Sequence, residues 1–231
     1  MPPEPPEGSH PAVMALNTPY YHNPRSELLA FLAQALGTIG PRVLNIGCAA
    51  GADAAGLRAL GAQVLHGVEP VAPAAAEARS HYDRVDACTF ADWEPPMRYD
   101  TVILADSLEH MPSPAPVLAT VRDLLDGQRP ILVLSLPNVR HVSVLLSLIL
   151  RGDWHYRSAG ILDDTHLRFF TARSVRRLLA GCGFAPVASR RYGAMRVTRL
   201  LERALPGSGE FLLSQLFILA QPLPLFPPSA L

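Results

Sequence analysis

The sequence predicts an α/β fold, in which helices cover both faces of a mostly parallel sheet. Short apolar segments of strand length alternate with helical segments five times between residues 43 and 138. Gly47 and Gly51 follow the first strand and open an alanine-rich helix, and Glu69 stands at the end of the second strand. The chain has 231 residues, 49% of them hydrophobic, which is enough for one substantial core.

The composition argues against several classes of function. The formal net charge is +0 and every basic residue is an arginine, so no basic surface for nucleic acid is expected. The 3 cysteines form no CxxC pair, which argues against a zinc knuckle or a disulfide framework and favours a reducing, cytoplasmic compartment. No secretory signal is visible. The longest apolar run, residues 142–150, is far short of the roughly 20 residues of a membrane span.

The first half of the chain gives the following elements in order. Residues 1–19 are rich in proline and are expected to form a flexible tail before a domain over residues 20–221. Ser26 is available to cap a helix whose apolar residues recur at helical spacing. Next we expect a strand that enters the glycine turn, a helix and a second strand, over residues 43–46, 54–60 and 63–68.

The glycine turn and Glu69 together predict a nucleoside site. A Cβ at either glycine would hold a ligand off the backbone or block the required φ, and an acidic residue at the end of the second strand is where such folds bind ribose hydroxyls. Ala49 and Ala52 stand where a dinucleotide fingerprint needs glycine. An adenosine-bearing ligand without a pyrophosphate, such as S-adenosylmethionine, therefore fits better. An ordinary turn without a ligand, and a solvated carboxylate at Glu69, remain as alternatives.

The elements expected next are a helix, two strands, a helix and a fifth strand, over residues 74–81, 84–89, 99–105, 116–125 and 131–136. The fourth strand ends at Asp106 and is followed closely by His110. Ligands collect outside the carboxyl ends of parallel strands, so both side chains stand where chemistry is expected.

Six segments of the chain resemble one known family. They are residues 43–51 (VLNIGCAAG), 67–69 (GVE), 99–103 (YDTVI), 105–110 (ADSLEH), 136–141 (LPNVRH) and 160–171 (GILDDTHLRFFT). The sequence resembles the class I S-adenosylmethionine-dependent methyltransferases, and within them a bacterial group found with glycosyltransferase and natural-product pathways. The resemblance spans roughly residues 20–221.

The resemblance implies a Rossmann-like, seven-stranded, mostly parallel sheet whose last strand is antiparallel and lies beside strand five. The turn would face the methionine end of the cofactor, Glu69 would hold the ribose, and the end of strand four would lie beside the sulfonium. A tyrosine near the start of the domain could cover the sulfonium through a cation-π contact. The cofactor-binding residues expected are Tyr21, Asn45, Gly47, Cys48, Ala49, Gly51, Glu69, Pro70, Thr89, Asp106 and Ser107.

Two of these positions depart from the family. Relatives usually have an acidic residue where this chain has Asn45, which accepts a hydrogen bond without the strengthening charge. Relatives also often have a Gly-Asp pair near the adenine, where this chain has Cys88 and Thr89.

Residues 138–171 are too many for a plain connection and predict a lid over the acceptor, which would exclude water and fix the geometry of transfer. The substrate residues expected there are Asn138, His141, Trp154, Tyr156 and Arg168. Histidine titrates near neutral pH, so His166 is our first candidate for a general base and His110 the second, ahead of the other two nearby histidines, His141 and His155. For each of them a structural role is the alternative. Asp163, Asp164 and His166 could also be metal ligands, but three ligands on one loop are weak evidence and no metal is expected.

The end of the chain predicts a helix over residues 171–182, a strand over 187–190 and a last strand over 211–220, before a proline-rich tail over 222–231. Five arginines between residues 190 and 203 suggest a phosphate site, although a solvated surface is the simpler interpretation at zero net charge.

We therefore expect an enzyme that moves a methyl group from S-adenosylmethionine to a small-molecule acceptor by in-line displacement, most simply to a hydroxyl of a sugar or secondary metabolite. N- or C-methylation, and a non-catalytic scaffold, are the alternatives. The sequence predicts no nucleic-acid partner and leaves a homodimer open.

Overall fold

The computed structural model describes residues 22–193 and 208–224. These residues belong to two compact units, 1–96 and 97–231, which are taken separately. Tyr20, Tyr21, the first proline-rich tail, residues 225–231 of the second tail, and Arg196, Arg199 and Arg203 lie outside the described residues.

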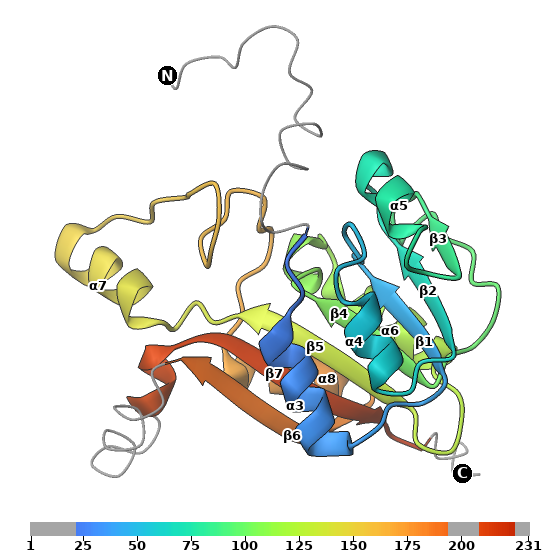
Figure 1. Ribbon diagram of the computed structural model, residues 1–231. Coiled ribbons are helices and arrows are strands. Elements are labelled where there is room, and N and C mark those ends of the chain that lie inside the picture. Colours follow the sequence, from blue (N-terminus) through green and yellow to red (C-terminus); the bar gives the residue numbers. More distant parts are fainter. Residues whose placement is uncertain (1–21, 194–207, 225–231) are drawn as a thin grey trace, which may run out of the picture. The chain divides into compact units, whose positions relative to one another are not determined.

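The first unit holds three parallel strands in the order β3-β2-β1 (Figure 1). They are β1 (Arg42–Ile46), β2 (Val64–Val68) and β3 (Arg84–Asp86). The β1 and β2 strands are in register from Arg42 opposite Val64 to Ile46 opposite Val68. The expected strand over residues 84–89 is too long, because the chain leaves the sheet after Asp86, whose carboxylate accepts hydrogen bonds from Arg84 and Trp93.

Three helices of the first unit are α3 (Ser26–Leu36), α4 (Ala54–Ala59) and α5 (Ala72–Ala78). The α3 helix buries Leu28, Phe31 and Leu32, the spacing of one helical face. The α5 helix packs against β2 and β3, and α3 packs against α4. Gly56 permits the second contact, because a Cβ there would lie 2.4 Å from Cδ1 of Leu29.

The second unit holds four strands in the order β4-β5-β7-β6. They are β4 (Thr101–Ala105), β5 (Ile131–Pro137), β6 (Phe184–Gly193) and β7 (Leu213–Pro222). The β4 and β5 strands are parallel, whereas β7 runs antiparallel to both β5 and β6. The described residues thus contain seven strands, mostly parallel, with an antiparallel last strand beside strand five, which confirms the predicted Rossmann-like class.

The helices of the second unit are α6 (Pro114–Leu124), α7 (Val142–Arg151) and α8 (Ala172–Gly181), with short 3-10 helices η1 (Leu108–His110) and η2 (Ser208–Leu212). The α8 helix packs on β6 and on α6. The α7 helix stands on the long connection between β5 and α8 (Figure 1). It buries only Val144, and Ile149 and Leu150 are about three-quarters exposed.

Candidate functional site

The turn after β1 has an unusual backbone. Gly47, Ala49 and Gly51 have φ values of 76°, 50° and 91°. The Gly47 amide donates to Val68 O at 2.8 Å and the Gly51 amide to Cys48 O at 3.0 Å, which fixes both ends of the turn. Ala49 is the strained position, since a residue with a Cβ rarely adopts a left-handed conformation. Its amide donates to Oε2 of Glu69 at 2.9 Å, which helps to hold this conformation.

Gly51 also has a packing reason to be glycine. A Cβ there would lie 3.1 Å from Cα of Ala78 and 3.1 Å from Cδ2 of His81. The missing side chain lets α5 approach the turn, in addition to the positive φ that glycine allows.

Glu69 lies at the carboxyl end of β2 and is 5% exposed. Its two oxygens accept hydrogen bonds from the amides of Ala49 and Val71, at 2.9 and 3.0 Å. Burial raises the pKa of this carboxyl, against the lowering effect of the two amides. A carboxylate has about four lone-pair sites, so two sites remain for a ligand after these bonds.

Asn45 stands one residue before the end of β1 and is 1% exposed. Its Nδ2 donates to the Tyr82 hydroxyl at 2.8 Å, and its Oδ1 is buried with no hydrogen-bond partner among the described residues. Burial raises the pKa of Tyr82 above its usual range, so the phenol stays protonated. An orphaned buried acceptor beside the strained turn is an observation that fits a bound donor.

Three other expected cofactor-binding residues of the first unit are Cys48, Pro70 and Thr89. Burial, followed by the nearby Glu69 charge, raises the pKa of the Cys48 thiol to about 12, so it is neither a nucleophile nor a ligand for a metal at neutral pH. Pro70 and Thr89 are exposed. The Thr89 hydroxyl donates to Oδ2 of Asp92 at 2.7 Å, within its own loop.

Sequence reasoning missed the Arg25–Asp53 pair. The Arg25 amide and guanidinium donate to the two oxygens of Asp53, at 2.7 and 3.0 Å, and tie the start of α3 to the end of the glycine turn. Both side chains are largely buried. They are 28 positions apart, and no local pattern could have paired them.

The end of β4 is held by neighbouring strands. Asp106 has a φ of 53° and its amide donates to Ser135 O at 3.0 Å. Its Oδ1 accepts from the Ser135 hydroxyl at 3.0 Å and from Nε2 of Gln215. The Ser107 hydroxyl donates to Ala105 O at 3.3 Å. Gln215, on β7, was not predicted, and it fixes the carboxylate that follows β4.

Three further side chains meet just beyond this point. Glu109 is fully buried, His166 is 8% exposed and His110 is partly buried. One ligand atom from each lies within 4.8 Å of the others. The two imidazole centroids are 4.8 Å apart and meet edge to face. Burial, and then the neighbouring His166, lower the pKa of His110. The structure thus brings together both histidines that we expect to be catalytic, and adds a carboxylate.

The sequence matches a family model. The model, described as a methyltransferase domain, covers residues 20–189, which is more than half of the chain. The chain belongs to this methyltransferase domain family. A search of curated proteins finds no match.

Solved structures of methyltransferases share the fold of this domain. Magnesium protoporphyrin IX methyltransferase from Synechocystis PCC 6803, with bound SAH, is 17% identical, with a TM-score of 0.59 over 84% of this chain and 80% of its own. A 1,6-didemethyltoxoflavin-N1-methyltransferase from Burkholderia thailandensis is 21% identical, with a TM-score of 0.54 over 86% and 77%. The CcbJ methyltransferase from Streptomyces caelestis is 15% identical, with a TM-score of 0.61 over 87% and 91%.

The five expected substrate residues of the methyltransferase domain fall in different settings. Asn138 is 1% exposed and uses its amide within the chain: Nδ2 donates to Glu210 O and Leu213 O, and Oδ1 accepts from the Arg140 amide. His141 caps α7 by accepting from the Ser143 amide.

The remaining three gather around Phe169 and the segment before α6. Trp154 and Tyr156 place their ring centroids 5.1 and 6.2 Å from that of Phe169. Arg168 donates from Nε to Pro112 O at 2.8 Å. Arg168 and Phe169 line an open cleft together with residues 112–116 and α8. Phe169 thus belongs both to the aromatic cluster and to the lining of this cleft.

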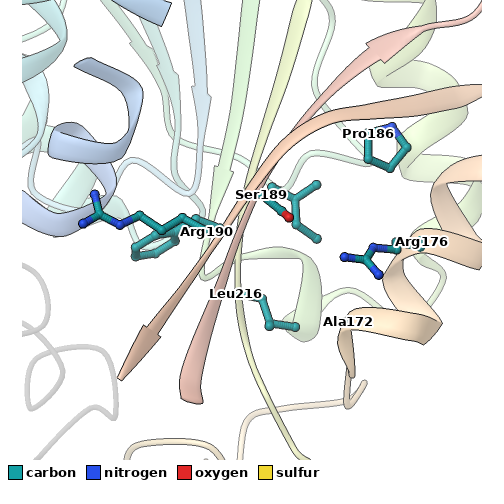
Figure 2. Close-up of a pocket in the computed structure, with 8 residues that line it drawn as sticks. Ala172, Arg176, Pro186, Ser189, Arg190 and Leu216 are labelled. Atoms are coloured by element: carbon teal, nitrogen blue, oxygen red, sulfur yellow. The ribbon is translucent and has the colours of Figure 1, made fainter. Parts of the chain in front are cut away.

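Of the five arginines near the end of the domain, only Arg190 has a side chain among the described residues. A small pocket between α8, β6 and β7 is lined by Arg176, Ser189 and Arg190 (Figure 2). Arg176 faces Ser189, whereas Arg190 extends to the opposite side of β6, as strand alternation requires.

Within residues 22–193 and 208–224, no helix is long and apolar enough to cross a membrane.

Proposed function

We propose that this domain is an S-adenosylmethionine-dependent methyltransferase whose acceptor is a hydroxyl of a small molecule, such as a sugar or a secondary metabolite. The single observation that supports the cofactor most directly is the buried Oδ1 of Asn45 beside the strained turn, which has no hydrogen-bond partner among the described residues. It provides an acceptor for the ammonium group of the cofactor's methionine. Glu69 supplies two further acceptor sites, which suit the two hydroxyls of a ribose. The sequence resemblance assigns these same roles.

S-adenosylmethionine, when bound, supplies an electrophilic methyl group on a sulfonium. The protein contributes orientation, exclusion of water and a place for the acceptor's proton. Residues 138–171 act as the lid: α7 offers an exposed apolar face, and Trp154, Tyr156 and Phe169 form an aromatic cluster. Nδ1 of His166 lies 3.1 Å from Ile161 O, which can only accept, so Nδ1 is the protonated nitrogen. The Nε2 atom then has the lone pair that would accept the acceptor's proton.

Calorimetric titration with S-adenosylmethionine and S-adenosylhomocysteine tests the cofactor. We expect the wild type to bind both, Glu69→Ala to lose most of the affinity, and Glu94→Ala, which changes an exposed carboxylate of the same unit, to bind as the wild type does. A wild type that binds neither compound contradicts the proposal. Binding without transfer to any acceptor would favour the non-catalytic scaffold, and product analysis by mass spectrometry distinguishes O- from N- or C-methylation. The protein is proposed to act in the cytoplasm, without nucleic acid, as a monomer or a homodimer.

A further inference from the structure

The cluster of Glu109, His110 and His166 has the composition of a metal site. It joins one carboxylate and two imidazoles, drawn from two segments of the chain that are 56 positions apart from His110 to His166. One ligand atom of each residue lies within 4.8 Å of the others, and Glu109 is fully buried. Two histidines and one carboxylate, with positions left open, hold catalytic zinc and non-haem iron in proteins.

Both imidazoles are oriented as metal ligands usually are. Nδ1 of His110 lies 3.2 Å from the carbonyl oxygen of Thr165, and Nδ1 of His166 lies 3.1 Å from that of Ile161. A carbonyl oxygen only accepts, so each Nδ1 carries the proton and each Nε2 keeps its lone pair. Metal-bound histidines characteristically donate their other ring N–H to a carbonyl or carboxylate, which fixes the tautomer and the ring plane.

A second layer supports His110. The Thr165 hydroxyl donates to Oδ1 of Asp163 at 2.5 Å and lies 3.1 Å from Nδ1 of His110. Its oxygen is therefore free to accept from the imidazole, in a relay from His110 through Thr165 to the Asp163 carboxylate. A charged group at the end of such a relay raises the basicity of the ligating nitrogen.

The main chain holds the two segments together. The amides of Leu167 and Arg168 both donate to the Glu109 carbonyl oxygen, at 2.9 Å. The His166 amide donates to Asp163 O at 3.1 Å. The carboxylate and the two imidazoles are thus attached to a bonded backbone frame.

We propose that Glu109, His110 and His166 bind one divalent transition-metal ion of the zinc class, through a carboxylate oxygen and the two Nε2 atoms, with the remaining positions open to an oxygen of the acceptor. A tetrahedral zinc with bonds of about 2.1 Å separates its ligand atoms by roughly 3.4 Å. One nitrogen of each imidazole and one carboxylate oxygen lie within 4.8 Å of one another, and side-chain rotation would bring the ligand atoms to the shorter separation. The proposed site departs from our sequence-based expectation of no metal, and it combines His166 with Glu109 and His110 in place of Asp163 and Asp164.

The role of the ion in catalysis, unlike the binding site itself, rests on the proposed function. A bound divalent ion lowers the pKa of a coordinated hydroxyl or water by several units. The acceptor's O–H bond then breaks as the acceptor binds the ion, its electron pair stays on the oxygen, and its proton is released to solvent before the lid closes. The acceptor is accordingly a compound with a hydroxyl, and a neighbouring oxygen would add a second bond to the ion. His166 serves in this scheme as a metal ligand and not as the base.

The test is metal binding by the full chain, tag-free and stripped with a chelator. We expect one Zn²⁺ per chain by calorimetry and elemental analysis, a rise in the thermal midpoint with Zn²⁺, and visible absorption bands when Co²⁺ is used. Glu109→Gln and His166→Ala should each weaken Zn²⁺ binding at least about 100-fold, and Thr165→Val, which removes only the relay, about tenfold. His155→Ala removes an exposed imidazole of the same unit and should leave the stoichiometry and affinity for Zn²⁺ unchanged.

Absence of a saturable Zn²⁺ or Co²⁺ site in wild type that remains folded by circular dichroism would overturn the proposal. Equal Zn²⁺ affinity in wild type and Glu109→Gln would also overturn it, since the ion would then sit elsewhere. Failure of the proposed function is a separate result: the chain would bind Zn²⁺ at this site and yet not bind S-adenosylhomocysteine. If transfer activity is found, full activity after chelation would refute the catalytic role of the ion, but it would not contradict the metal-binding site itself.

Discussion

Asn45→Asp is the substitution that tests the cofactor site most directly. Asn45 Oδ1 is buried and has no described partner, and the resemblance places the cofactor's ammonium group against it. An aspartate offers the same oxygen with a charge. The contact to Tyr82 survives, because the phenol can reverse the 2.8 Å hydrogen bond and donate to the carboxylate.

The expected gain follows from the difference between neutral and charged hydrogen bonds. A neutral bond contributes about 0.5–1.5 kcal/mol net and a bond to a charged group about 1.5–3 kcal/mol, a difference of roughly 1 kcal/mol. Since 1.4 kcal/mol is tenfold, Asn45→Asp should bind S-adenosylhomocysteine about fivefold more tightly. The ligand-free protein should lose stability, because the aspartate carries a charge into a site that is 1% exposed.

Calorimetry of wild type, Asn45→Asp and Asn45→Ala measures the affinity, and urea unfolding with and without the ligand measures the stability. Tyr82→Phe is the matched control, since it removes the hydroxyl and leaves the Asn45 oxygen in place. Weaker binding by Asn45→Asp, in a variant that remains folded, would refute the assignment of this oxygen to the ammonium group. Equal binding by wild type and Asn45→Ala would refute any contact at all.

Three further outcomes follow from single contacts. Burial raises the pKa of Glu69 above the ordinary value of 4.5. The affinity of the protein for S-adenosylhomocysteine should therefore be full above the raised pKa and should fall as the pH drops through it. Calorimetry across pH should show this fall, and Glu69→Gln should bind weakly at every pH. Gly67→Ala places a Cβ 2.6 Å from Sγ of Cys48, which should lower the free energy of unfolding by about 1–3 kcal/mol, and Cys48→Ala in the same chain should restore most of it in urea titrations. Asn138→Ala leaves two carbonyl oxygens without their buried donor and should cost about 2 kcal/mol in the same assay; a stable variant that loses only transfer would instead make Asn138 a substrate residue.

Local sequence patterns predicted the elements of the first unit well. The α3 helix lies where its apolar spacing indicates, and the glycine turn begins directly after β1. The errors lie at strand ends, because the length of a strand depends on the hydrogen bonds that its neighbour offers. The β6 strand runs over Phe184–Gly193 and not 187–190, because β7 offers it partners along its whole length, with a bulge near Pro186.

The candidate site was only partly visible in the sequence. His110 and His166 were expected near one cleft, and the structure brings their rings together. Glu109 was passed over because a carboxylate next to a histidine in a short 3-10 helix has no sequence pattern of its own. Glu109 comes close to His166 because the amides of Leu167 and Arg168, far along the chain, donate to its carbonyl oxygen and hold the two segments together. Gln215 and Arg25 were missed for the same reason.

Glu69 has one observed task, which is to support the turn, and one proposed task, which is to hold the ribose, and the two can be separated. Its carboxylate accepts from the Ala49 amide and so supports a residue at φ 50°, a conformation that costs about 1–2 kcal/mol with a Cβ present. Glutamine has a single acceptor oxygen and cannot satisfy the Ala49 and Val71 amides together, so Glu69→Gln disturbs the turn as well as the ribose contact. Ala49→Gly removes the strain without touching the carboxylate. Added to Glu69→Gln, it should restore the free energy of unfolding in urea but not the affinity for S-adenosylhomocysteine. If affinity returns as well, Glu69 acts by shaping the turn and not by holding the ribose.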